Sequence, residues 1–397
     1  MLKPKIRVAI CSSGAGHVFR GVEAWSYDMA DLLSEKGVQC QLYVGGGRPS
    51  RSYEKVLWCL KRTSTINKVL VTIFSKLGGW RYGLGSEFQI EQLSFVFPLL
   101  LELNRNKVDI VHTHEFMLAS YLQWMSDRGM LSAKLVYGHV TNEDNKALMK
   151  FDFVQHVSMV DMNDKRNQGC YKELWTAIPN FVDTDKFNPI RKASTNKQLR
   201  VKYGFPPKKL IFLTVAAIKR EHKRIDWLIK EMVEVKKEIP DFLWVIVGGR
   251  EKETEEIIAE GKRALGENVI FMVDLDRAIL PEIYQCADCF VLGSLREMFG
   301  IVLIEAISSG LVTFVHDHPV LKYVVGEGGV VLDMKRHGNL VRSIRSILAG
   351  DVLMQQKKTA ARCHAVNFFS KDAIYEPMIN YYTDIVGRNR GCGRLKN

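Results

Sequence analysis

Two glutamates, Glu297 and Glu305, flank a short hydrophobic stretch of the chain. The pattern predicts that Glu297 and Gly300 lie in a strand-to-helix turn and that Glu305 lies inside the following helix. A helix N-terminus carries unpaired N–H groups and a partial positive charge, which suit a phosphate. A carboxylate buried on an apolar helix is costly unless it accepts good hydrogen bonds. The segment therefore offers an anion site between two hydroxyl-binding carboxylates, which fits a sugar joined to a nucleotide through phosphates.

The elements that must position these residues are short β-rich runs alternating with helical patterns, as is typical of parallel α/β sheets. The first half contains these expected strands: Lys5–Ser12, Val38–Val44, Asp109–His112, Leu135–His139 and Val154–Ser158. The second half contains these: Leu210–Ala216, Leu243–Val247, Asn268–Val273, Cys289–Leu292, Val312–Val315 and Val330–Leu332. We therefore predict two doubly wound, Rossmann-like α/β domains, with ligands bound at the carboxyl ends of the strands in a crevice between them.

Helical patterns and a change of composition set the expected domain boundaries. A first helix carries Trp25, Met29, Leu32 and Leu33 on one face and ends at Gly37. A polar stretch over Asp183–Lys202 interrupts the α/β pattern, and a helix around Ala373–Ile385 precedes a basic tail. We predict an N-terminal domain over 1–182, a C-terminal domain over 183–372, and a final helix and tail over 373–397.

The composition is that of a globular protein: 397 residues, 47% hydrophobic and 25% charged. No apolar run approaches the roughly 18 residues that span a bilayer, and the N-terminus runs directly into a strand, so a cytoplasmic protein is expected. The eight cysteines are scattered. The lone C-x-x-C of Cys286 and Cys289 is expected to pack in the core rather than bind metal or exchange electrons.

The formal charge of +12 is concentrated in part of the chain, since residues 48–86 carry eight Lys or Arg and one acid. Apolar residues recur there at helical spacing: Tyr53, Val56, Leu57 and Leu60, then Ile66, Val69, Leu70, Ile73, Phe74 and Leu77. Two interpretations stay open. The segment forms ordinary domain helices with solvated lysines, or basic amphipathic helices that contact an anionic membrane surface. No RNA- or DNA-binding module is visible, so no nucleic-acid partner is expected.

Several segments, in order along the chain, resemble the retaining GT-B glycosyltransferases that carry an E-x7-E motif (glycosyltransferase family 4, group 1). The segments are Gly21–Glu23 with Glu35–Gly37, the interdomain segment Ile178–Pro189, Lys223–Ile229, and Glu297–Glu305 with Phe299 and Gly300 inside it. The resemblance implies two Rossmann-like domains that face a central cleft and a last helix that crosses back to the first domain. It also implies that the N-terminal domain takes the acceptor and the C-terminal domain the nucleotide-sugar donor.

By the same resemblance, the reaction moves a sugar from a nucleotide diphosphate sugar to an acceptor hydroxyl with retention at the anomeric carbon, with no metal or other cofactor. The acceptor would be a carbohydrate or a lipid-linked molecule, in cell-surface glycan or glycolipid synthesis. Contact of basic residues 48–86 with the inner face of the membrane remains an open alternative.

The motif assigns roles to individual residues. Glu297 would bind hydroxyls of the donor sugar, and Glu305 would bind the ribose hydroxyls. The amides of Phe299, Gly300 and Ile301 would take the diphosphate. These roles suit the chemistry, because a carboxylate accepts two hydroxyl protons in strong, charge-assisted hydrogen bonds.

Two further residues would act at the reaction centre. Lys223 would neutralise the diphosphate leaving group, whose charge grows in the transition state. His139, at the end of an expected strand, would face the donor sugar and hydrogen-bond a hydroxyl. The expected mechanism is front-face displacement, in which the leaving phosphate helps to deprotonate the incoming hydroxyl and the protein supplies positioning and charge stabilisation.

The chain also departs from the family pattern. Ala217 stands where the family usually has an arginine, six positions before the lysine, and the paired glycines of the N-terminal loop appear as Arg20-Gly21. We expect Arg20, Lys219 or Arg220 to supply the missing positive charge to the donor. An inactive relative is the alternative that this departure leaves open.

Other polar residues have simpler expected roles. His112 and His114 alternate along a strand and point to one side, where lining of a cleft or packing is expected rather than metal binding. His17 is placed near the acceptor or the phosphates. Asp276 resembles part of a metal-binding D-x-D but is expected to cap a helix.

Three rival functions remain. A GT-B epimerase would use a nucleotide sugar without an acceptor, and a non-catalytic relative would bind the nucleotide or a membrane and release no product. An NAD-dependent enzyme built on Gly14-Ala-Gly16 is disfavoured, because the spacing to Gly21 is wrong and no acidic residue ends the second strand.

Overall fold

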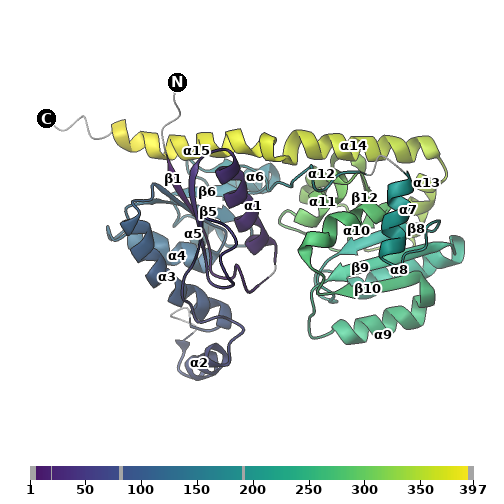
Figure 1. The fold of residues 1–397 in the computed structure, drawn as a ribbon, viewed down its shortest axis with the longest axis horizontal. Helices are drawn as coiled ribbons and strands as arrows, with labels where there is room; N and C mark the ends of the chain where they lie inside the picture. The colour runs from purple at the N-terminus through teal and green to yellow at the C-terminus, as the bar shows by residue number, and fades with distance from the viewer. Residues whose placement is uncertain (1–5, 19, 80–83, 190–192, 392–397) are drawn as a thin grey trace. The chain divides into compact units, whose positions relative to one another are not determined.

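The computed structural model describes residues 6–18, 20–79, 84–189 and 193–391. The chain forms two compact units, each a parallel sheet with helices packed against it (Figure 1). The first unit comprises the chain up to Pro179 together with the segment from Tyr375, and the second runs from Asn180 to Ile374. The sequence had suggested boundaries after residues 182 and 372.

The first unit is built on a seven-stranded sheet with the order β3-β2-β1-β4-β5-β6-β7 and parallel pairing throughout. Its strands are β1 (Arg7–Ser12), β2 (Gln39–Val44), β3 (Glu54–Val56), β4 (Ile110–Thr113), β5 (Lys134–His139), β6 (Phe153–His156) and β7 (Thr176–Ala177). The strand order reverses between β1 and β4. In such doubly wound sheets, ligands bind outside the carboxyl ends of the strands at this switch point.

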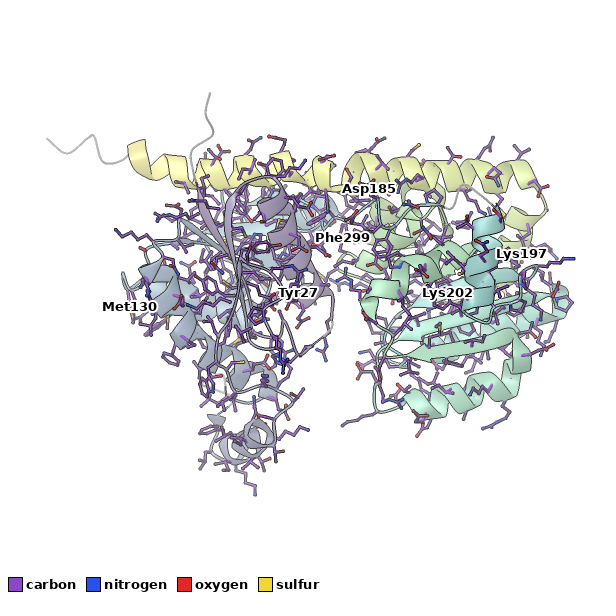
Figure 2. All side chains as sticks on the ribbon, viewed as in Figure 1. Tyr27, Met130, Asp185, Lys197, Lys202 and Phe299 are labelled. Atoms are coloured by element: carbon purple, nitrogen blue, oxygen red, sulfur yellow. The ribbon has the colours of Figure 1, made fainter. Side chains whose placement is uncertain are left out.

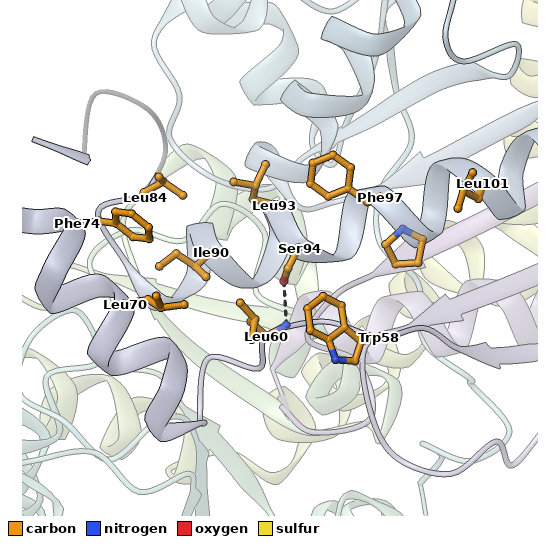
Figure 3. Close-up of a pocket in the computed structure, with 11 residues that line it drawn as sticks. Trp58, Leu60, Leu70, Phe74, Leu84, Ile90, Leu93, Ser94, Phe97 and Leu101 are labelled. Carbon is orange, nitrogen blue, oxygen red and sulfur yellow. Dashed lines mark hydrogen bonds between the residues drawn. The ribbon is translucent and has the colours of Figure 1, made fainter. Parts of the chain in front are cut away.

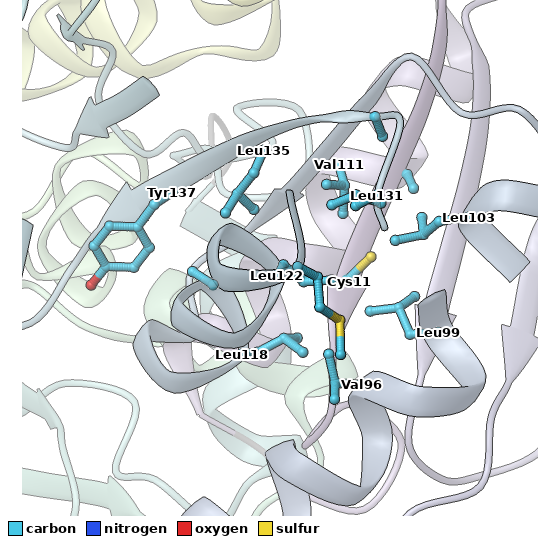
Figure 4. Close-up of a cluster of buried hydrophobic side chains, with 14 of the residues drawn as sticks. Cys11, Val96, Leu99, Leu103, Val111, Leu118, Leu122, Leu131, Leu135 and Tyr137 are labelled. Atoms are coloured by element: carbon cyan, nitrogen blue, oxygen red, sulfur yellow. The ribbon is translucent and has the colours of Figure 1, made fainter. Parts of the chain in front are cut away.

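The helices of the first unit cover this sheet. They are α1 (Gly21–Glu35), α2 (Thr65–Lys76), α3 (Glu87–Arg105), α4 (Phe116–Ser126), α5 (Asn145–Leu148), α6 (Met159–Asn167) and, from Tyr375 on, α15 (Lys371–Gly391). Figure 4 shows part of the core, where Val96 and Leu99 of α3 and Leu122 of α4 surround Cys11 of β1. These side chains are almost fully buried because the central strands of a parallel sheet are covered on both faces.

The second unit repeats the same topology, with the strand order β10-β9-β8-β11-β12-β13 and parallel pairing. Its strands are β8 (Leu210–Val215), β9 (Phe242–Gly248), β10 (Val269–Val273), β11 (Cys289–Val291), β12 (Val312–His316) and β13 (Gly329–Leu332). Its helices are α7 (Ala193–Lys202), α8 (Ile225–Glu238), α9 (Thr254–Leu265), α10 (Leu280–Cys286), α11 (Ile301–Ser308), α12 (Pro319–Val325), α13 (Asn339–Leu348) and α14 (Asp351–Phe369). Here the switch point lies between β8 and β11. The predicted α/β class with two doubly wound, Rossmann-like domains is confirmed.

Three predicted details are wrong. The helical spacing over 53–60 belongs to the short strand β3 and the loop after it, because Tyr53, Val56 and Leu57 fit a brief extended run as well as a helix. Strand β7 was not expected. The polar stretch over Asp183–Lys202 contains helix α7, which lacks the apolar periodicity that identified the other helices.

Within the described part of the chain, no helix combines the length and apolar character that crossing a membrane requires.

Candidate active site

The switch point of the second unit brings together two residues that the sequence separates widely. Lys223 lies in the loop after β8, and Glu297 lies in the loop after β11. The Lys223 Nζ donates a hydrogen bond of 2.5 Å to Glu297 Oε1, with side chains that are 20% and 11% exposed. The carboxylate and the ammonium thus form one mostly buried ion pair at the edge where this fold binds ligands.

The loop that carries Lys223 is held in place by its neighbour Arg224, the residue before α8. Arg224 adopts a left-handed backbone conformation, with φ of 53°, where a residue with a side chain is strained. Its guanidinium donates to the carbonyl oxygens of Met334 at 3.0 Å and Gly293 at 3.3 Å and lies over the ring of Trp227. These contacts tie the loop after β8 to those after β11 and β13.

Helix α11 begins without a side-chain cap. Gly300 precedes it with φ of 90°, a conformation that favours glycine, and no side chain bonds the first amides. Among the described residues, the amides of Gly300, Ile301 and Val302 have no recorded acceptor. The preceding Phe299, labelled in Figure 2, is 3% exposed and packs edge-on against Phe369. The start of α11 therefore presents free N–H groups on a fixed turn, which suits an anion.

Glu305 lies one turn farther along α11 and is 3% exposed. Tyr284 donates its hydroxyl hydrogen to Glu305 Oε2 at 2.9 Å, and Arg277 Nη2 lies 3.5 Å from Oε1. Burial, and then the Glu305 carboxylate, hold the pKa of Tyr284 well above its ordinary value, so the phenol remains a donor. The sequence predicted Glu305 inside a helix but missed Tyr284 and Arg277, which come from the segment 277–286 and have no motif.

The cations near Ala217 have different surroundings. Arg220 forms ion pairs with Glu253, Glu256 and Glu260 of the α9 region, and its backbone amide also donates to Glu253. Its guanidinium is thus engaged on α9 rather than at the Glu297 pair. Lys219 is half-buried, and no ion pair of its side chain is recorded among the described residues. Of the two substitutes predicted in this unit, Arg220 has competing partners and Lys219 has none recorded within the described part of the chain.

In the first unit, the loop after β1 is organised by Glu115, a buried carboxylate that follows β4. Glu115 accepts hydrogen bonds from the hydroxyls of Ser12 at 2.8 Å and Ser13 at 2.7 Å. Burial raises the pKa of Glu115 above its ordinary value, although these hydrogen bonds oppose the shift. A Cβ at Gly14 would lie 2.4 Å from Glu23 Oε1, so a larger residue there would displace the Glu23 carboxylate.

A second buried carboxylate, Glu91 of α3, lies beside this loop. Its Oε2 accepts a hydrogen bond from the Arg62 amide at 2.6 Å, and its Oε1 accepts one from Arg62 Nε at 2.8 Å. His17 Nε2 lies 2.8 Å from Oε2. Arg20 precedes α1 and is exposed, as is Gly21, the first residue of that helix. The sequence named His17, Arg20 and Gly21 for the site but gave no signal for Arg62 and Glu91.

His139 ends β5 and is fully buried among carboxylates. Its Nδ1 lies 2.8 Å from Asp161 Oδ2, and its Nε2 lies 3.2 Å from Glu143 Oε2. Burial alone would lower the pKa of His139, but Asp161 and Glu143 raise it above its ordinary value. Both ring nitrogens therefore face a carboxylate, in an environment that the sequence did not predict.

The remaining polar predictions can be compared with the structure directly. His112 bonds Tyr382 Oη at 2.7 Å, and the ring of His114 stacks on Trp25, so both histidines pack inside the first unit. Asp276 accepts a hydrogen bond from the Ala278 amide at 2.9 Å, which confirms its capping role. Cys286 and Cys289 are both free thiols in the core.

An open apolar groove of about 640 Å³ lies between α2 and α3 of the first unit (Figure 3). Its lining consists of Trp58, Leu60, Leu70, Phe74, Leu84, Ile90, Leu93, Ser94, Phe97, Pro98 and Leu101. The Ser94 hydroxyl accepts a hydrogen bond from the Leu60 amide and donates one to the Glu91 carbonyl oxygen, each at 2.9 Å. Its hydrogen-bonding capacity is therefore used. The groove thus offers mainly apolar contact, and among its lining residues the indole N–H of Trp58 is a donor with no recorded partner.

Comparison with known proteins shows that most of the second unit is similar to one family. Residues 195–364 match the family model described as Glycosyl transferases group 1. Mannosylfructose-phosphate synthase of Agrobacterium fabrum is 32% identical over 159 residues, which are 38% of this chain and 34% of that enzyme, so the match spans about a third of that relative.

Two other similarities extend over most of the chain. Alpha-monoglucosyldiacylglycerol synthase of Acholeplasma laidlawii is 23% identical over 79% of this chain and 85% of that enzyme. The crystal structure of Anabaena HepE, in complex with UDP and glucose, superposes with a TM-score of 0.71 at 15% identity, covering 94% of this chain and 98% of that one. This likeness confirms the predicted GT-B fold. Through residues 195–364, which are less than half of the chain, the protein resembles the group 1 glycosyl transferases.

Proposed function

We propose that this protein transfers a sugar from a nucleotide diphosphate sugar to an acceptor hydroxyl, with retention at the anomeric carbon and without a metal in the reaction. The observation that carries the proposal is the juxtaposition of the Lys223–Glu297 ion pair, the uncapped start of α11 and the buried Glu305. Each part matches one part of such a donor. The HepE structure, which is in complex with UDP and glucose, adds support from the same fold.

The diphosphate would bind the free amides of Gly300 and Ile301, where the helix dipole favours negative charge by about 0.3–1 kcal/mol and by up to about 2 kcal/mol when partly buried. Glu305 would accept the ribose hydroxyls, with Tyr284 holding one carboxylate oxygen in place. Glu297 would accept hydroxyls of the donor sugar. Its pairing with Lys223 fixes the carboxylate before the donor arrives, which reduces the entropy cost of binding.

In the reaction, the bond between the anomeric carbon and the phosphate oxygen breaks as the acceptor oxygen approaches from the same face. The leaving phosphate takes the acceptor's proton, so no enzyme nucleophile is needed. The Lys223 ammonium would stabilise the growing charge on the diphosphate, which is the usual electrostatic contribution of a fixed cation. Lys219 and Arg20 are the candidates to add charge in place of the arginine that Ala217 replaces.

A thermal-shift panel of UDP-, GDP- and ADP-sugars tests the donor site. Nucleotide sugars with one of these bases should raise the melting temperature of the wild type, and Glu305→Ala should abolish that shift. Glu256→Ala, an exposed change on α9, is the matched control and should keep it. Nucleoside diphosphate release with and without acceptors then separates transfer from epimerisation. A panel in which no nucleotide sugar stabilises the wild type would refute the proposal.

We also propose that the first unit contacts an anionic lipid bilayer, which would present a lipid-linked acceptor. Helix α2 carries Ile66, Val69 and Ile73 with exposed fractions of 64%, 51% and 47% beside the apolar groove. Exposed apolar surface of this kind marks an interaction site. The helix also carries two exposed lysines, Lys68 and Lys76, and no acid, which complements anionic headgroups. The similarity to the alpha-monoglucosyldiacylglycerol synthase of Acholeplasma laidlawii is consistent with such an acceptor.

Flotation with vesicles tests this contact. The wild type should bind vesicles of phosphatidylglycerol more strongly than those of phosphatidylcholine, and the double variant Ile66→Asp/Ile73→Asp should lose binding. Val352→Asp, which alters an equally exposed aliphatic residue on α14, is the control. Equal binding by wild type and the double variant would contradict the proposal.

A further inference from the structure

Three side chains at the carboxyl edge of the first sheet converge on one point. His139 ends β5, His156 ends β6, and Asp161 lies in the first turn of α6. The Nδ1 atoms of the two histidines are 3.1 Å apart, and each lies 2.8 Å from the same oxygen, Asp161 Oδ2. Two nitrogens and one oxygen thus form a nearly equilateral triangle.

Hydrogen bonding explains this triangle poorly. Either both Nδ1 atoms direct an N–H at one carboxylate oxygen, with the two hydrogens crowded together, or one Nδ1 accepts from the other across 3.1 Å and its lone pair then faces the carboxylate oxygen at 2.8 Å. Oxygen Oδ1 of Asp161 has no recorded part in either bond. A carboxylate has acceptor sites on both oxygens, yet both recorded contacts go to Oδ2.

A metal ion explains the spacing directly. Zinc binds histidine nitrogen and carboxylate oxygen at about 2.0–2.2 Å. Ligand atoms at that distance from one ion are about 3 Å apart at right angles and about 3.4 Å apart at the tetrahedral angle. The observed separations of 2.8 and 3.1 Å fall close to the lower of these values. The triangle therefore has nearly the size of one face of a metal coordination sphere.

The surroundings also suit an ion. The imidazole side chains are fully buried and Asp161 is 12% exposed, which leaves a route for solvent or a further ligand. Glu143 Oε2 lies 3.2 Å from the opposite nitrogen of His139, the position of the carboxylate that commonly orients a metal-bound histidine. The nearby cation, Lys165, is held by the Glu143 carbonyl at 2.8 Å and the Asn145 side chain at 3.1 Å.

We propose that His139, His156 and Asp161 form a binding site for a divalent transition metal ion of the zinc type. The donor set of two imidazoles and one carboxylate suits zinc and its neighbours rather than calcium or magnesium, which prefer oxygen ligands. The ion would fasten the ends of β5 and β6 to α6 and fix the segment from His139 to Glu143. The proposal gives His139 a role other than the donor-facing one expected from the sequence, because both of its ring nitrogens are then engaged. The donor site proposed on the second unit needs no metal.

The test uses the full chain without an affinity tag, stripped with a chelator and dialysed. Zinc chloride should raise its melting temperature by roughly 5 °C at saturation, and magnesium chloride should not. Elemental analysis after gel filtration should give about one zinc per chain. Cobalt(II) bound in place of zinc should give the visible absorption bands of a low-symmetry site. These bands report that side chains coordinate the ion, even where a variant folds poorly.

Asp161→Asn and His156→Gln should each reduce zinc affinity by at least about tenfold. His364→Gln, which alters a half-buried histidine of α14, is the matched control and should bind zinc as the wild type does. A wild type that retains no zinc, or variants that bind as tightly as the control, would overturn the proposal. A shift with magnesium equal to that with zinc would overturn it as well.

Discussion

Replacing Lys223 with methionine is the sharpest test of the donor site. Methionine keeps the unbranched side chain, shorter by one atom, but removes the ammonium that lies 2.5 Å from Glu297. A fixed charge-stabilising donor contributes about 3–4 kcal/mol to a transition state, so turnover should fall by roughly 10²–10³. The change also leaves Glu297, with an 11% exposed side chain, without its partner near an anionic donor.

The assay is the steady-state release of nucleoside diphosphate, with the donor identified by the thermal-shift panel. Lys230→Met, an exposed change on α8, is the control and should leave turnover unchanged. The double variant Lys223→Met/Glu297→Gln should lose less than the product of the two single losses, because the residues act as a pair. If Lys223→Met kept more than a tenth of wild-type turnover, the assignment of this lysine to the leaving group would be wrong.

Three further changes have defined outcomes. Ala217→Arg should tighten donor binding by about tenfold, measured by calorimetry, because a charged hydrogen bond contributes about 1.5–3 kcal/mol; unchanged affinity would show that the missing arginine is already compensated. Gly300→Ala should lower stability in urea by about 1–2 kcal/mol, since φ of 90° is strained for alanine, and an unaltered midpoint would contradict this. Burial would raise the pKa of Glu91, but hydrogen bonds from His17 and Arg62 outweigh it and lower the pKa. Glu91 therefore stabilises the fold above the unfolded pKa and loses this effect as pH falls through the folded one. Glu91→Gln should flatten the fall in melting temperature below about pH 5, and an equally steep fall would count against it.

Much of the fold could be predicted because buried parallel strands are continuous apolar runs between turn residues. All of the strongly apolar strands, such as β1 and β9, were expected within a few residues of their observed bounds. Helix α7 could not be recognised in this way. Arg200, 5% exposed, anchors it through bonds to the carbonyl of Cys286 and the carboxylate of Asp288, which are remote in sequence.

The candidate site shows the same division. The turn at Gly300 and the helical Glu305 were predictable, because both follow from a local pattern of strand, glycine and apolar helix. The contact between Lys223 and Glu297 was not, since it depends on the strand order that places the two loops side by side. Asp161 likewise gave no signal, because its partners come from two neighbouring strands.

The division of the chain into units has a consequence for biosynthesis. Segment 375–391 belongs to the first unit, where Tyr382 is fully buried and bonded to His112 of β4. The ribosome makes this segment only after the whole second unit. The first unit, whose residues up to 179 are translated first, therefore cannot complete its fold until the segment from 375 is made. Residues 180–374 can close earlier as they emerge. In nascent chains, the apolar surface of the first unit that segment 375–391 later covers would thus be exposed. Chaperones would bind the nascent chain at this surface.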